Sequence, residues 1–166
     1  MLVNLGYTCE AQKDLLEHLK TVTGVNYQDA TFNVPMWLIL ALQSELGEVI
    51  NASQVHKWWS KDKVNREHLL EELSDLLSHI GNLAIFLDVE LVLETEEVQV
   101  TAIETTFNKL AYRITTLTWD KRRARYTLIN YIVPLFLELV YSLGFDLGEL
   151  EDAYKIKMLG NYSRFK

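Results

Sequence analysis

The sequence has 166 residues, of which 49% are apolar and 23% charged, and this composition is typical of a globular protein with a sizeable core. We expect residues 1–166 to form a single domain. The formal net charge of −7 argues against general nucleic-acid binding, which needs a basic surface, and fits a site that collects metal cations. The single cysteine, Cys9, excludes an intramolecular disulfide framework and a cysteine zinc site.

The hydrophobic pattern predicts an all-α protein, a helical bundle of about five to six helices. Apolar residues recur at helical spacing, strand-type alternation is nearly absent, and no internal repeat is found. The expected helices cover residues 8–22, 35–59, 66–89, 96–117, 126–143 and 147–159. Pro35 suits the first position of its helix because a missing N–H costs nothing there, whereas Pro134 interrupts or opens the fifth helix. Residues 23–34, 60–65 and the basic stretch 120–125 are expected to be connections.

The most apolar stretch, residues 128–145, predicts a buried helix or part of a subunit interface. Asn130, Pro134 and Glu138 interrupt it, and it falls short of a clean membrane-spanning length. The N-terminus lacks the basic region and the long apolar stretch of a signal peptide. We therefore expect no membrane association, and a cytoplasmic location is the default expectation.

Two acidic pairs, Glu45 with Glu48 and Glu72 with Asp75, lie beside the apolar stripes of neighbouring predicted helices. Each pair has i,i+3 spacing, so both of its side chains share one helix face. Such pairs are ordinarily solvated, but Glu45 falls inside an apolar stripe and Glu72 borders another. A short connection predicts an antiparallel hairpin, in which the four carboxylates converge.

Buried like charges are costly unless a cation neutralises them, and oxygen ligands suit Mg²⁺. Neither apolar stripe supplies a basic residue in a position to pair with these acids. A di-iron bundle is the obvious rival, but it needs Glu-x-x-His pairs, and the sequence has none. The carboxylates therefore predict a Mg²⁺ site.

The spacing Glu45-Leu-Gly-Glu48, followed by Glu72-Leu-Ser-Asp75, resembles the ExxE…ExxD signature of the all-α nucleoside triphosphate pyrophosphatases. That superfamily includes MazG-type enzymes and the dimeric dUTPases. Two further segments resemble the dimeric dUTPases: Lys57-Trp58-Trp59-Ser60, and the C-terminal spacing of Tyr154, Lys157, Asn161 and Arg164.

The resemblance implies a homodimer with a four-helix core that hydrolyses dUTP to dUMP and pyrophosphate. It implies that Mg²⁺ is bound by Glu45, Glu48, Glu72 and Asp75, with Glu45 or Glu48 orienting the attacking water. The same resemblance places the substrate against residues from several segments, namely Gln12, Lys57, Trp58, His79, Asn82, Lys157, Asn161 and Arg164.

Three readings of the sequence remain open. Leu16 stands where the family has a polar residue in the base pocket, and Ser78 stands where the family often has histidine, with His79 next. These departures keep open a broader MazG-like pyrophosphatase that cleaves other nucleotides. A non-catalytic helical interaction protein, in which the acids form only a polar seam, predicts no stabilisation by Mg²⁺.

Overall fold

The computed structural model describes residues 1–25, 34–96, 98, 100–117 and 120–164. Its helices and strands follow one another in the order β1 (Leu2–Asn4), α1 (Gly6–Thr23), α2 (Met36–Ser53), α3 (Arg66–Leu87), β2 (Val92–Glu94), α4 (Ile103–Thr115), α5 (Lys121–Thr127), η1 (Leu128–Ile132), α6 (Val133–Ser142) and α7 (Leu147–Arg164). The π-helical turn η1 joins α5 and α6 into one helix, Lys121–Ser142.

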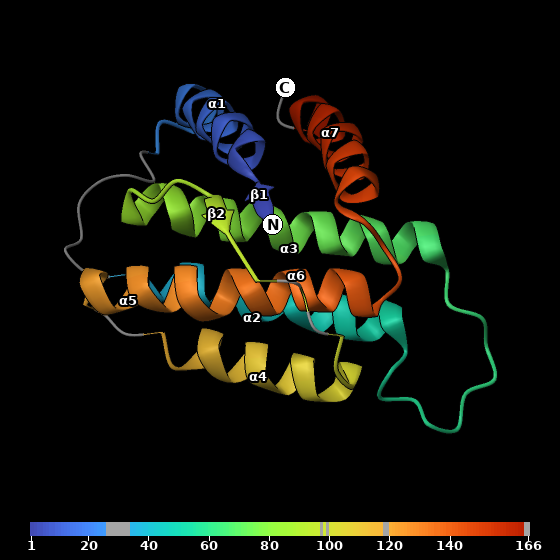
Figure 1. Ribbon diagram of the computed structural model, residues 1–166. Coiled ribbons are helices and arrows are strands. Elements are labelled where there is room, and N and C mark those ends of the chain that lie inside the picture. Colours follow the sequence, from blue (N-terminus) through green and yellow to red (C-terminus); the bar gives the residue numbers. More distant parts are fainter. Residues whose placement is uncertain (26–33, 97, 99, 118–119, 165–166) are drawn as a thin grey trace.

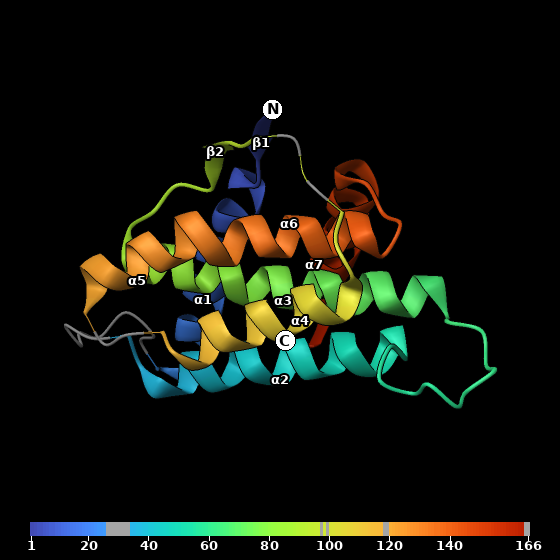
Figure 2. The ribbon, with the colours of Figure 1, turned by 60° about the horizontal axis from the view of Figure 1, so that its bottom comes forward.

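Helices α2, α3, α4 and α5–α6 form a four-helix bundle, and α1 and α7 lie together on the outer side of α3 (Figures 1 and 2). This arrangement confirms the predicted all-α helical bundle. The α2–α3 pair is antiparallel, as its short connection predicted (Figure 1).

The predicted apolar stripes form the core of the bundle. On α3 the stripe is fully enclosed, and its members are Leu69, Leu73, Leu76, Ile80, Leu83 and Leu87. Asn65 begins this helix, because its side chain accepts a hydrogen bond from the backbone N–H of His68, and Asp88 ends it in the left-handed conformation. Helical spacing and a polar cap therefore fix both the orientation and the start of α3.

The apolar stretch at residues 128–145 packs inside this chain. Leu128, Ile132, Phe136, Leu137 and Val140 are all fully buried. One face of the stretch is therefore a buried helix face, as predicted, and Leu135 and Leu143 are only partly buried. Among the described residues, no single helix is long and apolar enough to cross a membrane, although one pair bent by 102° passes a test of length and composition together.

Helix α2 ends at Ser53, six residues before the predicted end at Trp59. Gln54 takes the left-handed conformation at φ 56°, which stops the helix. Of the residues that follow, Val55 packs partly against the core, whereas Trp58 is 89% exposed. The connection between α2 and α3 therefore runs from residue 54 to residue 65.

The basic stretch 120–125 was predicted to be a connection, and it is the beginning of a helix. Asp120 caps α5 by accepting a hydrogen bond from the backbone N–H of Arg122, and Ala124 is buried. Arg125 turns its guanidinium back to donate a hydrogen bond to the carbonyl of Leu87 at the end of α3. One buried alanine and one cap thus place a basic segment in a helix.

One of the two proline positions differs from expectation. Pro35 precedes α2 as its N-cap, with an extended backbone at ψ 140°, instead of occupying the first helical turn. Pro134 stands in the first turn of α6, directly after η1, so it opens this part of the helix as expected, and the π turn relieves the clash between the proline ring and the preceding turn.

The two short strands pair in antiparallel register, with Val3 opposite Leu93, and the sequence pattern did not reveal them. Helix α4 begins at Ile103 instead of residue 96, and α7 extends to Arg164. Of the predicted connection 23–34, residues 26–33 lie outside the described residues.

Candidate active site

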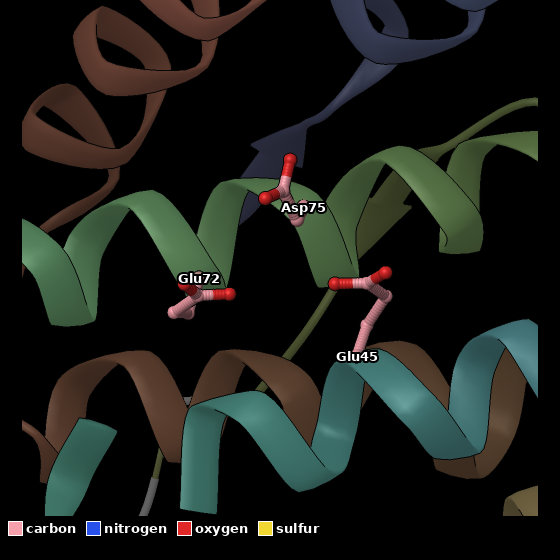
Figure 3. A group of neighbouring side chains, drawn as sticks. All are labelled: Glu45, Glu72 and Asp75. Carbon is pink, nitrogen blue, oxygen red and sulfur yellow. The ribbon is translucent and has the colours of Figure 1, made fainter. Parts of the chain in front are cut away.

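Three of the four predicted metal ligands converge between α2 and α3. Glu45 projects from α2 toward Glu72 and Asp75 on α3 (Figure 3). One carboxylate oxygen of each residue lies within 4.8 Å of those of the other two. Glu48 is exposed and lies outside this group. The i,i+3 spacing therefore brings both acids of the α3 pair to the cluster but only Glu45 of the α2 pair.

Simultaneous ionisation of the three carboxyl groups in this cluster is unfavourable. Burial, followed by repulsion from Asp75 and Glu72, raises the pKa of Glu45. Burial and repulsion from Asp75 likewise raise the pKa of Glu72. Glu48 adds repulsion to the pKa of both glutamates despite its exposed position. A divalent cation fits this donor set, because carboxylate oxygens are hard ligands and a cation among them relieves their mutual repulsion.

Basic side chains contact each carboxylate of the cluster. Lys157 on α7 places its Nζ 2.7 Å from Asp75 Oδ2. His79 Nε2 lies 3.6 Å from Glu45 Oε1, and His68 Nδ1 lies 3.5 Å from Glu72 Oε1. Burial alone would lower the pKa of Lys157, but the hydrogen bond and charge attraction to Asp75 raise it above the usual lysine value. Lys157 is therefore a fixed cation at the carboxylates.

A pocket of about 300 Å³ opens beside the cluster, and four helices supply its walls. Six of the predicted substrate-binding residues line it, namely Gln12, His79, Asn82, Lys157, Asn161 and Arg164. Along α3 the pocket residues follow helical spacing from Asp75 through His79 and Asn82 to Phe86. The pocket thus runs from an acidic end, where Lys157 also lies, to an apolar end.

Gln12 is held in the pocket wall by α7. It is 2% exposed, and its Nε2 donates to the hydroxyl of Tyr154 at 2.9 Å and to Met158 Sδ at 3.4 Å. Burial raises the pKa of Tyr154 to about 12, so its hydroxyl stays protonated at neutral pH. The N-terminal and C-terminal helices are therefore joined through a buried polar contact at the pocket.

The apolar end of the pocket contains residues that sequence reasoning did not select. They are Leu15, Leu19, Trp37, Leu38, Ile85 and Phe86. Spacing on α3 could have found Phe86, because it continues the face that carries Asp75, His79 and Asn82. Leu16, the departure from the family pattern, lies in the same wall.

Lys57 and Trp58 stand apart from the pocket. Both are exposed in the connection after α2, and neither is among the described residues that line the pocket. Trp58 packs edge-on against Trp59, with ring centroids 5.8 Å apart. A substrate contact for these two residues stays a prediction.

Comparison with known families adds an independent result to this geometry. The family model for dUTPase matches residues 4–166, which include every site residue described above. Comparison with curated proteins and comparison with solved structures each return no match. The match covers nearly the whole sequence and, within it, the acidic cluster and the pocket beside it, so the chain belongs to the dUTPase family.

Proposed function

We propose that this chain hydrolyses dUTP to dUMP and pyrophosphate in a reaction that depends on Mg²⁺. The observation that carries the proposal is the pocket itself, in which three carboxylates meet Lys157 at one end and apolar side chains form the other. Such a pocket matches a nucleotide, whose triphosphate is charged and whose flat base has faces that pack against apolar side chains. The family match supports the same substrate.

Glu45, Glu72 and Asp75 are the residues that would hold Mg²⁺, with Glu48 near them on α2 as a further oxygen ligand. When bound, the ion supplies neutralisation of phosphate charge and lowers the pKa of an attacking water. Burial raises the pKa of Glu45, which makes its carboxylate a stronger proton acceptor than an exposed glutamate. Glu45 or Glu48 therefore orients the water, and His79 contacts the Glu45 carboxylate.

Lys157 and Arg164 would hold the phosphates. Both lie on the same wall of the pocket, and Lys157 already contacts Asp75 at the acidic end. Charge-assisted hydrogen bonds from lysine and arginine to phosphate oxygens are short and strong, so they keep the triphosphate in line for attack. Asn161 on α7 and Gln12 on α1 add amide groups to this wall.

The experiment is a measurement of pyrophosphate release from dUTP, dCTP, dTTP, dATP, dGTP and UTP, with Mg²⁺ and with EDTA. We expect Mg²⁺-dependent release from dUTP. The second candidate is a broader nucleoside triphosphate pyrophosphatase, which Leu16 in the pocket wall favours because leucine cannot hydrogen-bond a base. Release from most of the nucleotides would assign the chain to that class, and no release by folded protein would remove both proposals.

The homodimer is a proposal that rests on the family resemblance. The apolar stretch at residues 128–145 lends it little support, because its largest apolar side chains, such as Phe136 and Leu137, are already buried within the chain. Light scattering on the eluting peak of a gel-filtration column distinguishes a 19.3 kDa monomer from a dimer.

A further inference from the structure

Arg66, the first residue of α3, holds the corner where the chain turns from α6 into α7. The connection between those two helices passes beside the first turn of α3 (Figure 1). Arg66 Nη2 donates to the carbonyl of Gly144 at 2.9 Å and to Glu149 Oε1 at 2.7 Å. The guanidinium also lies over the ring of Phe145, 4.1 Å from its centroid. One side chain of α3 thus contacts successive parts of the corner.

Glu149 connects Arg66 to the first turn of α7. Its Oε2 accepts a hydrogen bond from the backbone N–H of Asp146, and Asp146 Oδ1 accepts one from the N–H of Glu149, so the two residues form a reciprocal cap. The hydrogen bond from Arg66 lowers the pKa of Glu149, which keeps this carboxylate charged at neutral pH. Arg66 therefore holds the residue that fixes where α7 begins.

A second ionic contact joins the same two helices further along the chain, between Asp75 on α3 and Lys157 on α7. Arg66 precedes Asp75 by nine residues, which is about 14 Å along α3. Glu149 precedes Lys157 by eight residues, which is about 12 Å along α7. Because the two spacings match, one position of α7 along α3 satisfies both contacts.

The apolar contacts of α7 do not fix that position by themselves. Its buried side chains occur once per turn, at Leu150, Tyr154 and Met158, whereas Ile156 and Leu159 are each 72% exposed. Burial of so narrow a stripe is non-directional, so it holds α7 against α3 without setting how far along α3 it lies. Charged hydrogen bonds are directional, and Arg66 supplies them at the start of the helix.

We propose that Arg66 is a positioning residue, which sets the register of α7 on α3 and thereby holds Lys157 at the acidic end of the pocket. The inference rests on the proposed function, in which Lys157 binds the phosphates. Arg66 and Glu149 are 54% and 41% exposed at their side chains, so their ion pair adds little to stability. Its loss should therefore change the position of Lys157 more than the folding of the chain.

Carbodiimide cross-linking, without metal or nucleotide, tests the position of Lys157. The reagent joins Lys157 to Asp75, whose Nζ and Oδ2 lie 2.7 Å apart. It likewise joins Lys155 to Glu151, which pair within α7. Arg66→Ala should lower the yield of the first amide by about threefold or more, because α7 gains alternative positions. The yield of the second amide, internal to α7, should stay unchanged. Peptide mass spectrometry measures both yields.

The kinetic test measures hydrolysis of dUTP. Arg66→Ala and Arg66→Lys should each lower kcat by about tenfold with little change in KM, because a small displacement of a phosphate-holding group disturbs the reacting geometry. Lysine keeps the charge but lacks the guanidinium fork. In a Lys157→Ala background, Arg66→Ala should cause no further loss, since both changes act through one side chain. Arg123→Ala, at an exposed position on α5, is the matched control and should leave kcat and both cross-link yields unchanged.

Thermal unfolding shows whether each variant folds, and Arg66→Lys decides the test should Arg66→Ala fail to fold. An unchanged yield of the amide between Lys157 and Asp75 in a folded Arg66 variant would overturn the inference. So would full activity of Arg66→Lys, or an undiminished effect of Arg66→Ala in the Lys157→Ala background. If the unaltered protein does not hydrolyse dUTP, the proposed function fails, whereas the cross-link yields still decide whether Arg66 sets the register of α7.

Discussion

Two neighbouring glutamates on α3 show how strongly position sets the chemistry of a carboxylate. The side chain of Glu71 is 60% exposed, whereas that of Glu72 is 14% exposed and faces Glu45 and Asp75. Burial and the charge of Asp75 raise the pKa of Glu72. The charge on Glu72 therefore costs folding free energy in the metal-free protein.

We expect Glu72→Gln to stabilise the metal-free protein and to reduce its stabilisation by Mg²⁺. Removing one buried charge should raise the melting temperature by about 2–4 °C, the shift that about 1 kcal/mol produces in a domain of this size. Glu71→Gln is the matched control and should leave both quantities almost unchanged. Thermal scans at pH 8, with EDTA and with Mg²⁺, measure both. A larger Mg²⁺ effect in Glu72→Gln than in Glu71→Gln would contradict the metal site.

The gain in stability from Glu72→Gln should shrink as the pH falls. The pKa of Glu72 in the folded protein lies above its ordinary value of 4.5. Above the raised pKa both folded and unfolded states are ionised, so the native state bears the full cost of the charge. Between the two pKa values the native state takes up a proton first, and the cost disappears near pH 4.5. Melting temperatures of the variant and the unaltered protein, measured without metal from pH 8 to pH 4.5, should converge.

Lys157 occupies the position of a cation at Asp75, 2.7 Å from its Oδ2. Lys157→Ala should therefore bind Mg²⁺ more tightly, because a competing positive charge is gone. It should also hydrolyse dUTP with a kcat/KM lower by about 10- to 100-fold, because a charged hydrogen bond to phosphate is lost. Lys155→Ala is the control, since Lys155 pairs with Glu151 on the surface. Weaker Mg²⁺ binding by folded Lys157→Ala would show that the lysine supports the cluster instead of competing with a metal.

At the scale of the helix, one glycine sets the distance between α1 and α3. A Cβ added at Gly81 would lie 2.5 Å from Thr8 Cγ2 and 3.4 Å from Gln12 Cγ. Thr8 and Gln12 are both buried, so neither can move aside easily. The absence of a side chain at Gly81 is what allows Gln12 to reach the pocket.

We expect Gly81→Ala to destabilise the protein although alanine favours helices. The forced overpacking should cost about 1–3 kcal/mol, and displacement of Gln12 should raise KM for dUTP. Gly47 on α2 has nothing within 4 Å of an added Cβ, so Gly47→Ala should stabilise by up to about 1 kcal/mol through helix propensity alone. Urea unfolding of both variants compares them. Equal effects would show that α1 does not pack on α3 at this point.

Helices were predictable where an apolar stripe had to be buried, as on α3, but their ends were not. The early end of α2 depends on a left-handed Gln54, which no residue preference favours. The helical segment at residues 121–127 depends on one buried alanine and a cap. Within the site, spacing on α3 placed Glu72, Asp75, His79 and Asn82 together, because one helix carries them all. Convergence of α1 and α7 arises from tertiary packing, which only the family resemblance anticipated.

At the scale of the whole molecule, α1 and α7 form a layer against α3 of the four-helix bundle (Figure 1). Residues of both parts line the pocket. The bundle supplies the carboxylates through α2 and α3, and the layer supplies Gln12, Lys157, Asn161 and Arg164. Tyr154 joins the two helices of the layer, packing edge-on against Tyr7 with ring centroids 5.4 Å apart. A ligand in the pocket therefore contacts both parts of the molecule at once.

Ligand binding should protect the α1–α7 layer from hydrogen exchange more than it protects the far side of the bundle. A ligand that binds only when α1 and α7 are packed on α3 makes local opening of these helices less frequent, by mass action. Hydrogen exchange should therefore slow mainly in the segments that must open to release the ligand. With Mg²⁺ and α,β-imido-dUTP, exchange should slow most at residues 12–19 and 157–164. It should change little in α4, which supplies no side chain to the pocket among the described residues. Mass spectrometry of exchanged peptides measures this, and Lys157→Ala should lose most of the protection. Protection spread evenly over α4 and α7 would mean that the ligand stabilises the molecule as a whole instead of joining its two parts.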